Sequence, residues 1–600
     1  MTNVLTDLPA KNFERFGDRE AFSHRVDDRW EPVSWRSFNH DVDCVAAAME
    51  IVGVGETDNI TIFSANRPEI LITDFAAYAN RAVPVSIYST SSLAQVEYIV
   101  NDCGAQILFV GTREQLDMAV EALDKCPTLQ QIVVFDTMAL SGYDRKHVML
   151  FADFVTLGAN ASAETRNEVI ARRSRAQADD IATIIYTSGT TGEPKGAVLP
   201  HSCFNAQLPI HKRRLTTVTE ADTAVCFLPL SHIFEKAWCY FCLWRGVRVA
   251  VNNDPRRIQE TLREVRPSCM CSVPRFWEKA YIAVNDRIAS MSAFQRKMVK
   301  MALSVGRKRN LDYVRLNRPV PWMLEKSYQF FEKRVFSLLK RAMGVENGNI
   351  FPTAGAPLST SIVEFFHSCG INVMIGYGLS ETTATVTCFP QYDYQIGTVG
   401  TPVERVQVKI GEQNEILVKG PTVMRGYYNK PEETAAAFTP DGWLRTGDAG
   451  RLDLSGALIL TERIKDLFKT SNGKYIAPQA LESRLGEDKY IEQVAVIGDQ
   501  RKFVTAIIIP AKEAIMEYAR QKKIQFKSME DLVRNSEIIK LIQDRIDALQ
   551  KNFASFERIK KFTLLPKAFT MEAGELTNTL KIRRPVISKH YAAEIEAMYA

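Results

Sequence analysis

The sequence has few of the features that mark disulfide-rich, membrane-spanning or nucleic-acid-binding proteins. Its eleven cysteines are odd in number and scattered, which indicates free thiols in a reducing compartment. No apolar run approaches the roughly 18 residues of a membrane span, and the N-terminus has no basic region followed by an apolar stretch. The net charge of +5 is too small for general nucleic-acid binding. We therefore expect no nucleic-acid partner and a cytoplasmic protein, with peripheral contact at the inner membrane face left open.

What is present is the composition of a folded enzyme-sized protein. Hydrophobic residues make up 46% and charged residues 24% of the 600 positions, and this balance is typical of globular chains. Apolar runs rich in β-branched residues alternate with helical patterns, at 60–63, 83–87, 106–110 and 131–135. This alternation predicts βαβ units on a largely parallel sheet, with ligands at the carboxyl ends of the strands.

Residues 286–344 differ from this pattern. They have long helical periodicity, many lysines and arginines and few acidic residues, so we expect a basic helical insertion. One interpretation is a surface that lies on anionic lipid. The other is a solvated helical layer whose aromatic residues pack on the main body. The aromatic residues concerned are Trp322, Phe330, Phe331 and Phe336.

After Gly411 the pattern changes to short strands with tight turns. Alternation on either side of Ser455-Gly456 predicts a hairpin. A polar, charge-dense stretch at 461–466 follows, and strand patterns at 493–497 and 504–509 lie beyond it. We place a domain boundary there, which predicts a large domain at 1–462 and a small α/β domain at 463–600.

The segment 184–196 carries the strongest chemical signal. A strand pattern runs into a loop of glycines, hydroxyls and one lysine, and these residue types build a phosphate-binding loop. The spacing is not that of a Walker A loop, because Lys195 is followed by glycine and not by serine or threonine. The candidate phosphate-binding residues are Thr187, Ser188, Gly189, Thr190, Thr191 and Lys195.

This loop resembles the signature of the adenylate-forming superfamily, which includes acyl-CoA synthetases, firefly-type luciferases and the adenylation domains of peptide synthetases. Further segments resemble the other motifs of the superfamily, in its order, at 228–232, 376–382, 443–448 and 463–466. The resemblance implies an α/β fold with a large N-terminal domain, made of parallel-sheet subdomains and a small β-barrel-like subdomain, and a smaller mobile C-terminal domain. It also implies that ATP and a carboxylic acid form an acyl-AMP, whose acyl group then passes to the thiol of CoA.

The resemblance assigns roles around the nucleotide. Glu381 matches the carboxylate that holds Mg2+, a hard cation that prefers oxygen ligands. Tyr377, between Gly376 and Gly378, matches the platform for adenine, and the glycines would leave space on the faces of its ring. Asp448 matches the acceptor of both ribose hydroxyls, a role that suits a carboxylate. Two further residues are expected beside the phosphate and the sugar respectively, Ser380 and Arg463.

The resemblance also assigns the moving parts. Lys465 matches the hinge about which the small domain pivots, and Gly473 lies in a loop expected on the CoA side. Lys581 matches the catalytic lysine in the form seen in long-chain acyl-CoA synthetases, with Arg583, Arg584 and Lys589 as rivals. His232 is expected near the phosphates and the mouth of the acyl tunnel, in a gating or positioning role. Trp238 could gate an acyl tunnel, but its spacing differs from that of the tryptophan in fatty-acid relatives.

Several features favour a long-chain fatty acid as the substrate. These are the context of Lys581, the basic insertion, and Gly355, Ala356 and Pro357, which resemble the long-chain branch. The expected partners are therefore a fatty acid, ATP and CoA, with Mg2+ as the cofactor. Two alternatives stay open: a fatty acyl-AMP ligase that loads a carrier protein, and a non-catalytic lipid-binding scaffold. Chain length is open, and so is the oligomeric state, a homodimer included.

Overall fold

In the described part of the chain, the largest sheet has eight strands and follows the alternation seen in the sequence. The computed structural model describes residues 4–187, 193–464, 467–471, 474–577 and 581–600. Strands β8 to β7 pair in parallel, whereas β9 pairs antiparallel with both of its neighbours, β8 and β18. The βαβ prediction is therefore confirmed. In spatial order the strands are β18 (Gly426–Tyr427), β9 (Lys195–Pro200), β8 (Ile181–Thr187), β4 (Val83–Ile87), β3 (Asn59–Phe63), β5 (Ile107–Val110), β6 (Gln131–Val134) and β7 (Val148–Leu150).

Within the described residues, the large body also contains three smaller, four-stranded sheets. Cys269 forms backbone bridges with Ala224 on one side and Ile350 on the other, and so joins the first two of these sheets. The third sheet is antiparallel and contains the predicted hairpin, in which Gly456 has a positive φ of 80°. The first sheet contains β10 (Thr223–Cys226), β11 (Arg248–Val251), β1 (Glu20–Val26) and β2 (Arg29–Ser34); the second β12 (Phe351–Thr353), β13 (Val373–Tyr377), β14 (Thr387–Cys388) and β15 (Thr401–Pro402); the third β16 (Gln407–Ile410), β17 (Glu415–Lys419), β19 (Leu444–Leu452) and β20 (Leu458–Arg463).

Helices cover these sheets, and α9 (Ile233–Arg245) lies deepest among those near the site. Its residues from Ile233 to Leu243 have buried side chains, Glu235 and Lys236 included, apart from the half-buried Phe234. All eleven cysteines are free, as predicted, and all are buried. Cys239 and Cys242 are spaced as Cys-x-x-Cys but belong to this core helix. The other helices of the large body are α1 (Leu8–Phe16), α2 (Trp35–Ile51), α3 (Pro68–Ala79), α4 (Leu93–Cys103), α5 (Arg113–Leu123), α6 (Phe151–Ala159), α7 (Ala163–Arg175), α8 (His201–Arg214), α10 (Ile258–Val265), α15 (Thr360–Ser368) and α16 (Pro431–Ala437).

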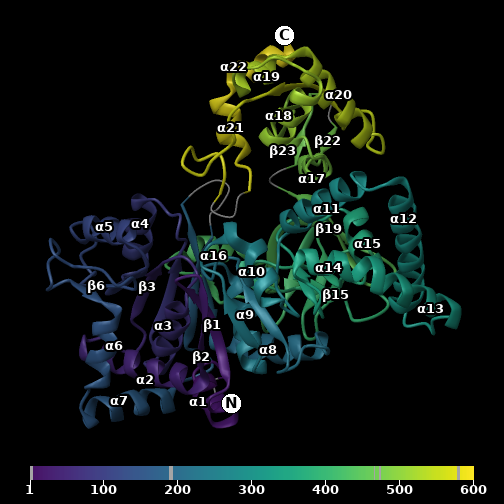
Figure 1. Ribbon diagram of the computed structural model, residues 1–600. Helices are drawn as coiled ribbons and strands as arrows, with labels where there is room; N and C mark the ends of the chain where they lie inside the picture. The colour runs from purple at the N-terminus through teal and green to yellow at the C-terminus, as the bar shows by residue number, and fades with distance from the viewer. Residues whose placement is uncertain (1–3, 188–192, 465–466, 472–473, 578–580) are drawn as a thin grey trace.

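The basic segment folds as helices at the right-hand edge of Figure 1. Phe331 and Phe336 are buried there, whereas Trp322 and Phe330 are exposed. The aromatic residues therefore divide between the two interpretations: Phe331 and Phe336 pack on the protein, and Trp322 and Phe330 face outward. The helices are α11 (Pro274–Ala289), α12 (Ala293–Arg307), a π-helical turn at Lys308–Val314, α13 (Trp322–Phe331), a second π-helical turn at Glu332–Phe336 and α14 (Ser337–Met343).

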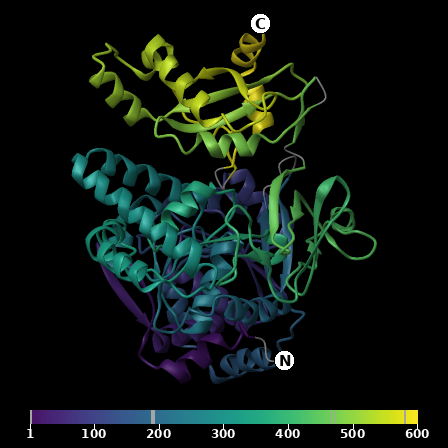
Figure 2. The ribbon, with the colours of Figure 1, turned by 90° about the vertical axis from the view of Figure 1, so that its right-hand side faces the viewer.

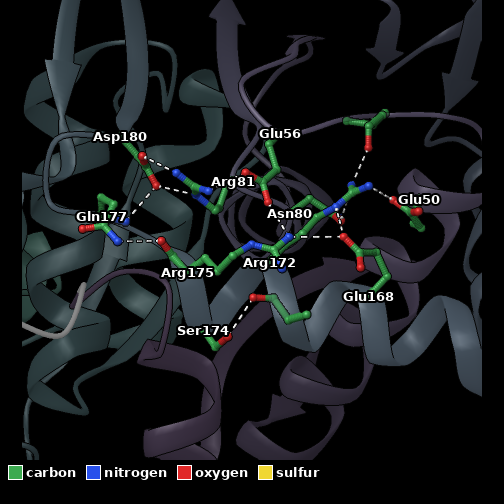
Figure 3. Close-up of polar contacts among 12 residues, drawn as sticks. Glu50, Glu56, Asn80, Arg81, Glu168, Arg172, Ser174, Arg175, Gln177 and Asp180 are labelled. Carbon is green, nitrogen blue, oxygen red and sulfur yellow. Dashed lines mark hydrogen bonds and ion pairs between the residues drawn. The ribbon is translucent and has the colours of Figure 1, made fainter.

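A network of ion pairs holds the base of β8 (Figure 3). Asp180, immediately before β8, binds Arg81, with Nε 2.8 Å from Oδ2, and Arg81 also pairs with Glu56. From α7, Arg175 pairs with Glu56 at 2.7 Å, and Arg172 donates to the Val54 carbonyl at 2.8 Å. Half-buried arginine pairs of this kind give geometric specificity, so the start of the strand that leads to the phosphate loop is fixed.

The C-terminal part forms its own small sheet and lies at one end of the molecule (Figure 2). Along β23 (Ile491–Ile497) and β24 (Val504–Pro510), alternate residues enter separate hydrophobic clusters on the two faces, the period expected of a sheet covered on both sides. An ion pair joins the two parts: Arg275 of α11, in the large body, lies 3.0 Å from Glu492 of β23. Its remaining elements are β21 (Phe468–Lys469), β22 (Tyr475–Ile476), α17 (Pro478–Leu485), α18 (Lys512–Gln521), α19 (Met529–Arg534), α20 (Ser536–Leu549), β25 (Ile559–Leu564), α21 (Arg584–His590) and α22 (Ala592–Tyr599).

Among the helices of the described residues, none combines the length and the hydropathy needed to cross a bilayer.

Candidate active site

The two ends of the predicted phosphate loop are held together. Thr187 ends β8 and Lys195 begins β9; the two are register partners, with Thr187 Oγ1 donating to the Lys195 carbonyl at 3.4 Å. Helix α4 supports both ends, because Tyr186 O–H donates to Asp102 at 2.5 Å and Tyr98 O–H donates to the Pro194 carbonyl at 3.1 Å. The other predicted loop residues lie outside the described residues: Ser188, Gly189, Thr190 and Thr191.

Glu381 lies beside the far end of this loop. It is in the 3-10 turn Ser380–Thr382, and its Oε1 accepts a hydrogen bond from Tyr427 O–H at 2.8 Å. Lys195 Nζ lies 5.4 Å from the centroid of the same tyrosine ring. Ser380 is buried next to Glu381. Tyr427, which belongs to the edge strand β18, was not predicted, because its position in the sequence carries no motif.

Tyr377, Asp448 and Arg463 form one hydrogen-bonded group. Tyr377 O–H donates to Asp448 Oδ2 at 2.7 Å, and Arg463 Nε donates to Asp448 Oδ1 at 3.1 Å. Asp448 on β19 and Arg463 at the end of β20 are register partners, so the hairpin brings them together. Burial, followed by the charge of Asp448, raises the pKa of Tyr377 well above its usual range, and the phenol stays protonated. Both carboxylate oxygens of Asp448 thus face hydrogen-bond donors.

Glycine is required beside Tyr377 for a different reason from the one expected. A Cβ on Gly378 would lie 1.9 Å from the Ala384 carbonyl oxygen, and one on Gly376 would lie 3.1 Å from that of Thr387. Close approach of the following backbone, more than space on the ring faces, requires Gly378. Thr383 and Ala384 both have a positive φ, at 51° and 76°, where this backbone turns back.

The predicted Gly-Ala-Pro follows β12. Gly355 has a φ of 95°, a conformation that favours glycine, and it is exposed together with Ala356 and Pro357. The preceding Ala354 lines the cavity described below. The three residues therefore lie at the surface where β12 ends, next in the chain to a residue of the cavity wall.

His232 and Lys581 come together from distant parts of the chain. His232 precedes α9, and its Nδ1 accepts the Phe234 N–H at 3.2 Å. Burial, with a further contribution from the charge of Lys581, lowers the pKa of His232 to about 4. The imidazole is therefore neutral at physiological pH.

The neighbours of Lys581 differ in their surroundings. Arg584 donates to the Val496 carbonyl at 2.8 Å and pairs with Glu482, both within the small domain. Arg583 Nη1 lies 3.4 Å from the Gly574 carbonyl oxygen. Lys589 is exposed on α21. Exposure does not separate Lys589 from Lys581, because both are exposed. Lys581 differs in that its charge contributes to lowering the pKa of His232 in the large body, and its catalytic role stays a prediction. Lys465 and Gly473 lie outside the described residues.

A narrow cavity of about 40 Å³ adjoins Tyr377. Its wall includes apolar and aromatic side chains of α9, Trp238 among them, and polar side chains of α8. The sequence suggested Trp238 as a gate of an acyl tunnel at an unusual spacing, and the fold places it in the same cavity wall as Tyr377. Further lining residues are Gln207, His211, Leu215, Phe234, Ala237, Phe241, Thr353, Met374, Thr385 and Cys388.

A model of the AMP-binding enzyme family matches residues 10–428, and a model of the AMP-binding enzyme C-terminal domain matches residues 465–600. The chain belongs to the AMP-binding enzyme family. Among its relatives is a long-chain-fatty-acid–CoA ligase, FadD15, of Mycobacterium tuberculosis, which is 32% identical over 97% of this chain and 94% of its own length. The long chain acyl-CoA synthetase 7 of Arabidopsis thaliana is 28% identical over 98% of this chain and 85% of its own length.

Solved structures support the fold of this AMP-binding enzyme. The A-PCP didomain of a carboxylic acid reductase from Segniliparus rugosus, in complex with AMP, has a TM-score of 0.77 at 20% identity and covers 99% of this chain and 82% of its own. The adenylation domain of a carboxylate reductase from Mycobacterium chelonae has a TM-score of 0.76 at 22% identity, with coverages of 99% and 91%. The predicted α/β fold, with a large N-terminal and a smaller C-terminal part, is thus confirmed.

The surroundings of Glu381 fit Mg2+ held together with a nucleotide. Mg2+ is usually bound through one or two carboxylates and substrate phosphates. Glu381 supplies a carboxylate whose Oε1 is already oriented by Tyr427. Among the described residues, the group close enough to act as a three-ligand cage is Cys226, Glu235 and Cys239, whose thiols do not suit Mg2+.

Glu235 is a buried acid that sequence analysis missed. It lies on the first turn of α9, and its Oε2 accepts the Leu228 N–H at 2.9 Å and the Cys271 thiol at 3.1 Å. The carboxylate thereby holds the 228–232 segment against its own helix. Burial raises the pKa of Glu235 to about 7, although these hydrogen bonds oppose the shift. The one sequence feature that could have drawn attention to Glu235 is its position three residues after His232 of the 228–232 motif.

Proposed function

We propose that this AMP-binding enzyme is a long-chain fatty acid–CoA ligase. The fatty acid carboxylate attacks the α-phosphorus of ATP, a phosphorus–oxygen bond breaks, and pyrophosphate leaves with its electron pair. The thiol of CoA then attacks the acyl carbonyl, loses its proton, and AMP leaves. The full-length similarity to the mycobacterial long-chain-fatty-acid–CoA ligase supports this choice of substrates.

The observation that carries the proposal is the double role of Tyr377. Its ring lines the apolar cavity, and its hydroxyl binds Asp448. A carboxylate suits the two hydroxyls of a ribose, and an apolar cavity suits an acyl chain. One residue therefore separates a nucleotide site from an acyl site, and the acyl-adenylate would lie across it.

In the first step the chain supplies charge and position. Lys581 neutralises the charge that develops between the carboxylate and the α-phosphate, a task that preorganised cations perform. Lys195 and the loop from Thr187 bind the outer phosphates. Neutral His232 positions the reacting groups and adds no positive charge of its own. Mg2+, held by Glu381, supplies charge neutralisation at the phosphates when bound.

The second step requires the small domain to move. We assign the domain boundary to Arg463, with domains 1–462 and 463–600, the pivot to Lys465 and the CoA-side loop to Gly473. Proximity of Lys581 to His232 corresponds to the adenylating arrangement. Gly473→Leu is expected to stall the enzyme after acyl-AMP has formed; a block of pyrophosphate release instead would reject this assignment of the loop.

The decisive test is nucleotide analysis after purified protein is incubated with ATP, Mg2+, CoA and fatty acids of increasing chain length. Formation of AMP and pyrophosphate that depends on both the acid and CoA is expected. Accumulation of acyl-AMP regardless of CoA would favour an acyl-AMP ligase that loads a carrier protein. No turnover with any acid would favour the non-catalytic scaffold.

Exposed apolar residues of the basic segment support contact with an anionic membrane. Trp322 and Met323 at the start of α13 are 72% and 75% exposed. Phe294 and Met301 are exposed on α12 beside Lys297 and Lys300, and no described acidic residue forms a salt bridge with either lysine. Aromatic and basic residues on one surface are typical of interfacial helices.

Flotation with vesicles tests this surface. The double variant Lys297→Glu/Lys300→Glu is expected to lose binding to anionic vesicles, whereas Lys522→Glu/Lys523→Glu on the small domain serves as the matched control. Arg309 is unsuitable for substitution, because it pairs with Glu325 at 2.7 Å. Equal binding by both variants would mean that this surface faces solvent and does not bind anionic lipid. Homodimerisation stays a prediction, which light scattering would test.

A further inference from the structure

Two buried polar atoms in the cavity wall lack hydrogen-bond partners. Gln207 on α8 is 2% exposed and Trp238 on α9 is 5% exposed. Within the described part of the chain, neither Gln207 Oε1 nor Trp238 Nε1 has a partner, and both side chains line the cavity. Leaving a buried donor or acceptor unpaired is costly. A wall that binds only a hydrocarbon chain would gain nothing from either atom.

A third polar group lies in the same wall. His211 Nδ1 lies 2.9 Å from the Gln207 carbonyl oxygen, and Nε2 lies 3.1 Å from Thr385 Oγ1. A carbonyl oxygen can only accept, so Nδ1 carries the hydrogen. Nε2 of the neutral ring therefore accepts from the Thr385 hydroxyl, because burial lowers the pKa of His211 to about 4. Thr385 Oγ1 keeps its own acceptor capacity beside the cavity.

The unpaired atoms are one acceptor and one donor, and a hydroxyl group can act as both a donor and an acceptor. We propose that the preferred substrates are fatty acids with a hydroxyl group on the acyl chain, which donates to Gln207 Oε1 and accepts from Trp238 Nε1. This inference rests on the proposed function, and it specifies the substrate class of the same site.

A water molecule could occupy the same position in the absence of substrate, since a cavity of about 40 Å³ is large enough to hold one. A chain hydroxyl would replace that water and both of its hydrogen bonds. An unsubstituted chain would leave the two polar atoms unpaired. Sites built to bind a hydroxyl discriminate strongly against analogues that lack it.

The experiment is a competition among acids of equal chain length. Purified enzyme receives ATP, Mg2+, CoA and a mixture of the unsubstituted acid with one monohydroxy acid, and the acyl-CoA products are quantified. The series moves the hydroxyl from the carbon next to the carboxyl group to the terminal carbon. We expect kcat/KM for one position, or for adjacent positions, to exceed that for the unsubstituted acid by about tenfold or more. Equal or lower values at every position would overturn the proposal.

Variants assign the effect to this wall. Gln207→Met removes the acceptor at similar volume and is expected to bring the preference close to one while the unsubstituted acid is still converted. Leu215→Met, another lining residue, is the control and should keep the preference. Trp238→Phe removes the N–H donor and serves if Gln207→Met fails to fold. An unchanged preference in a folded Gln207→Met or Trp238→Phe variant would overturn the proposal. Failure of the proposed function itself would appear differently, as no acyl-CoA from any acid.

Discussion

The positive charge of Lys581 adds to burial in lowering the pKa of His232 to about 4. More than half of the chain lies between the two residues. A lysine at the C-terminal end of the protein is thus near the end of the 228–232 motif of the large body. This relationship ties the catalytic assignment to the placement of the small domain.

Lys581→Ala is expected to abolish acyl-AMP formation, with a loss of about 10²- to 10³-fold. Thioester formation from supplied acyl-AMP should stay close to the wild-type rate, because the charge of Lys581 is needed only in the first step. ATP–pyrophosphate exchange and single-turnover CoA transfer measure the two steps separately. Lys589→Ala, on the neighbouring helix α21, is the control. Equal loss of both steps would reject the assignment of separate arrangements.

The pH dependence of adenylation should show no inflection near the ordinary pKa of histidine. His232 stays neutral above about pH 4, so its protonation state does not change over the working range. Adenylation rates between about pH 5 and about pH 8 test this expectation. An inflection near pH 6.5 that disappears in His232→Asn would contradict it.

Gly378→Ala is expected to destabilise the protein and to displace the site. The new Cβ would lie 1.9 Å from the Ala384 carbonyl oxygen, so the backbone between Tyr377 and Glu381 must move. Overpacking of this kind costs about 1–3 kcal/mol in the free energy of unfolding. Chemical denaturation and the KM for ATP measure the two effects. Gly486→Ala, where the nearest atom to the new Cβ lies at 3.3 Å, should be milder; equal effects would show that the close approach is not the cause.

Glu235→Gln is expected to change how stability depends on pH. In the folded protein the pKa of Glu235 is about 7, above the usual glutamate value of 4.5, so the folded state binds this proton more tightly. The contribution of Glu235 to stability is therefore complete below about pH 4.5 and is lost as the pH rises through about 7, by about 3 kcal/mol. Glutamine does not titrate.

Denaturation of both proteins at about pH 5 and about pH 8 measures this difference. The stability of Glu235→Gln relative to the wild type should increase with pH. A constant difference across this range would mean that the carboxylate does not titrate there, and that its role is confined to the hydrogen bonds with Leu228 and Cys271.

Local patterns determined much of this protein in advance. The strands near 60–63, 83–87 and 131–135 and the hairpin around Ser455-Gly456 follow from periodicity and turn chemistry, which act over a few residues. The chemistry of the loop between Thr187 and Lys195 likewise follows from residue type. These predictions needed no knowledge of long-range contacts.

Tertiary structure alone decided which distant groups meet. Tyr427 reaches Glu381 from an edge strand, and Gln207 of α8 and Trp238 of α9 line the same cavity. The reason for Gly378 also became visible only there, since the clash involves the backbone of Ala384. Such contacts depend on how whole elements pack, and spacing along one chain carries no record of that packing. The sequence therefore determined the kinds of chemistry available, and the fold determined which residues share one site.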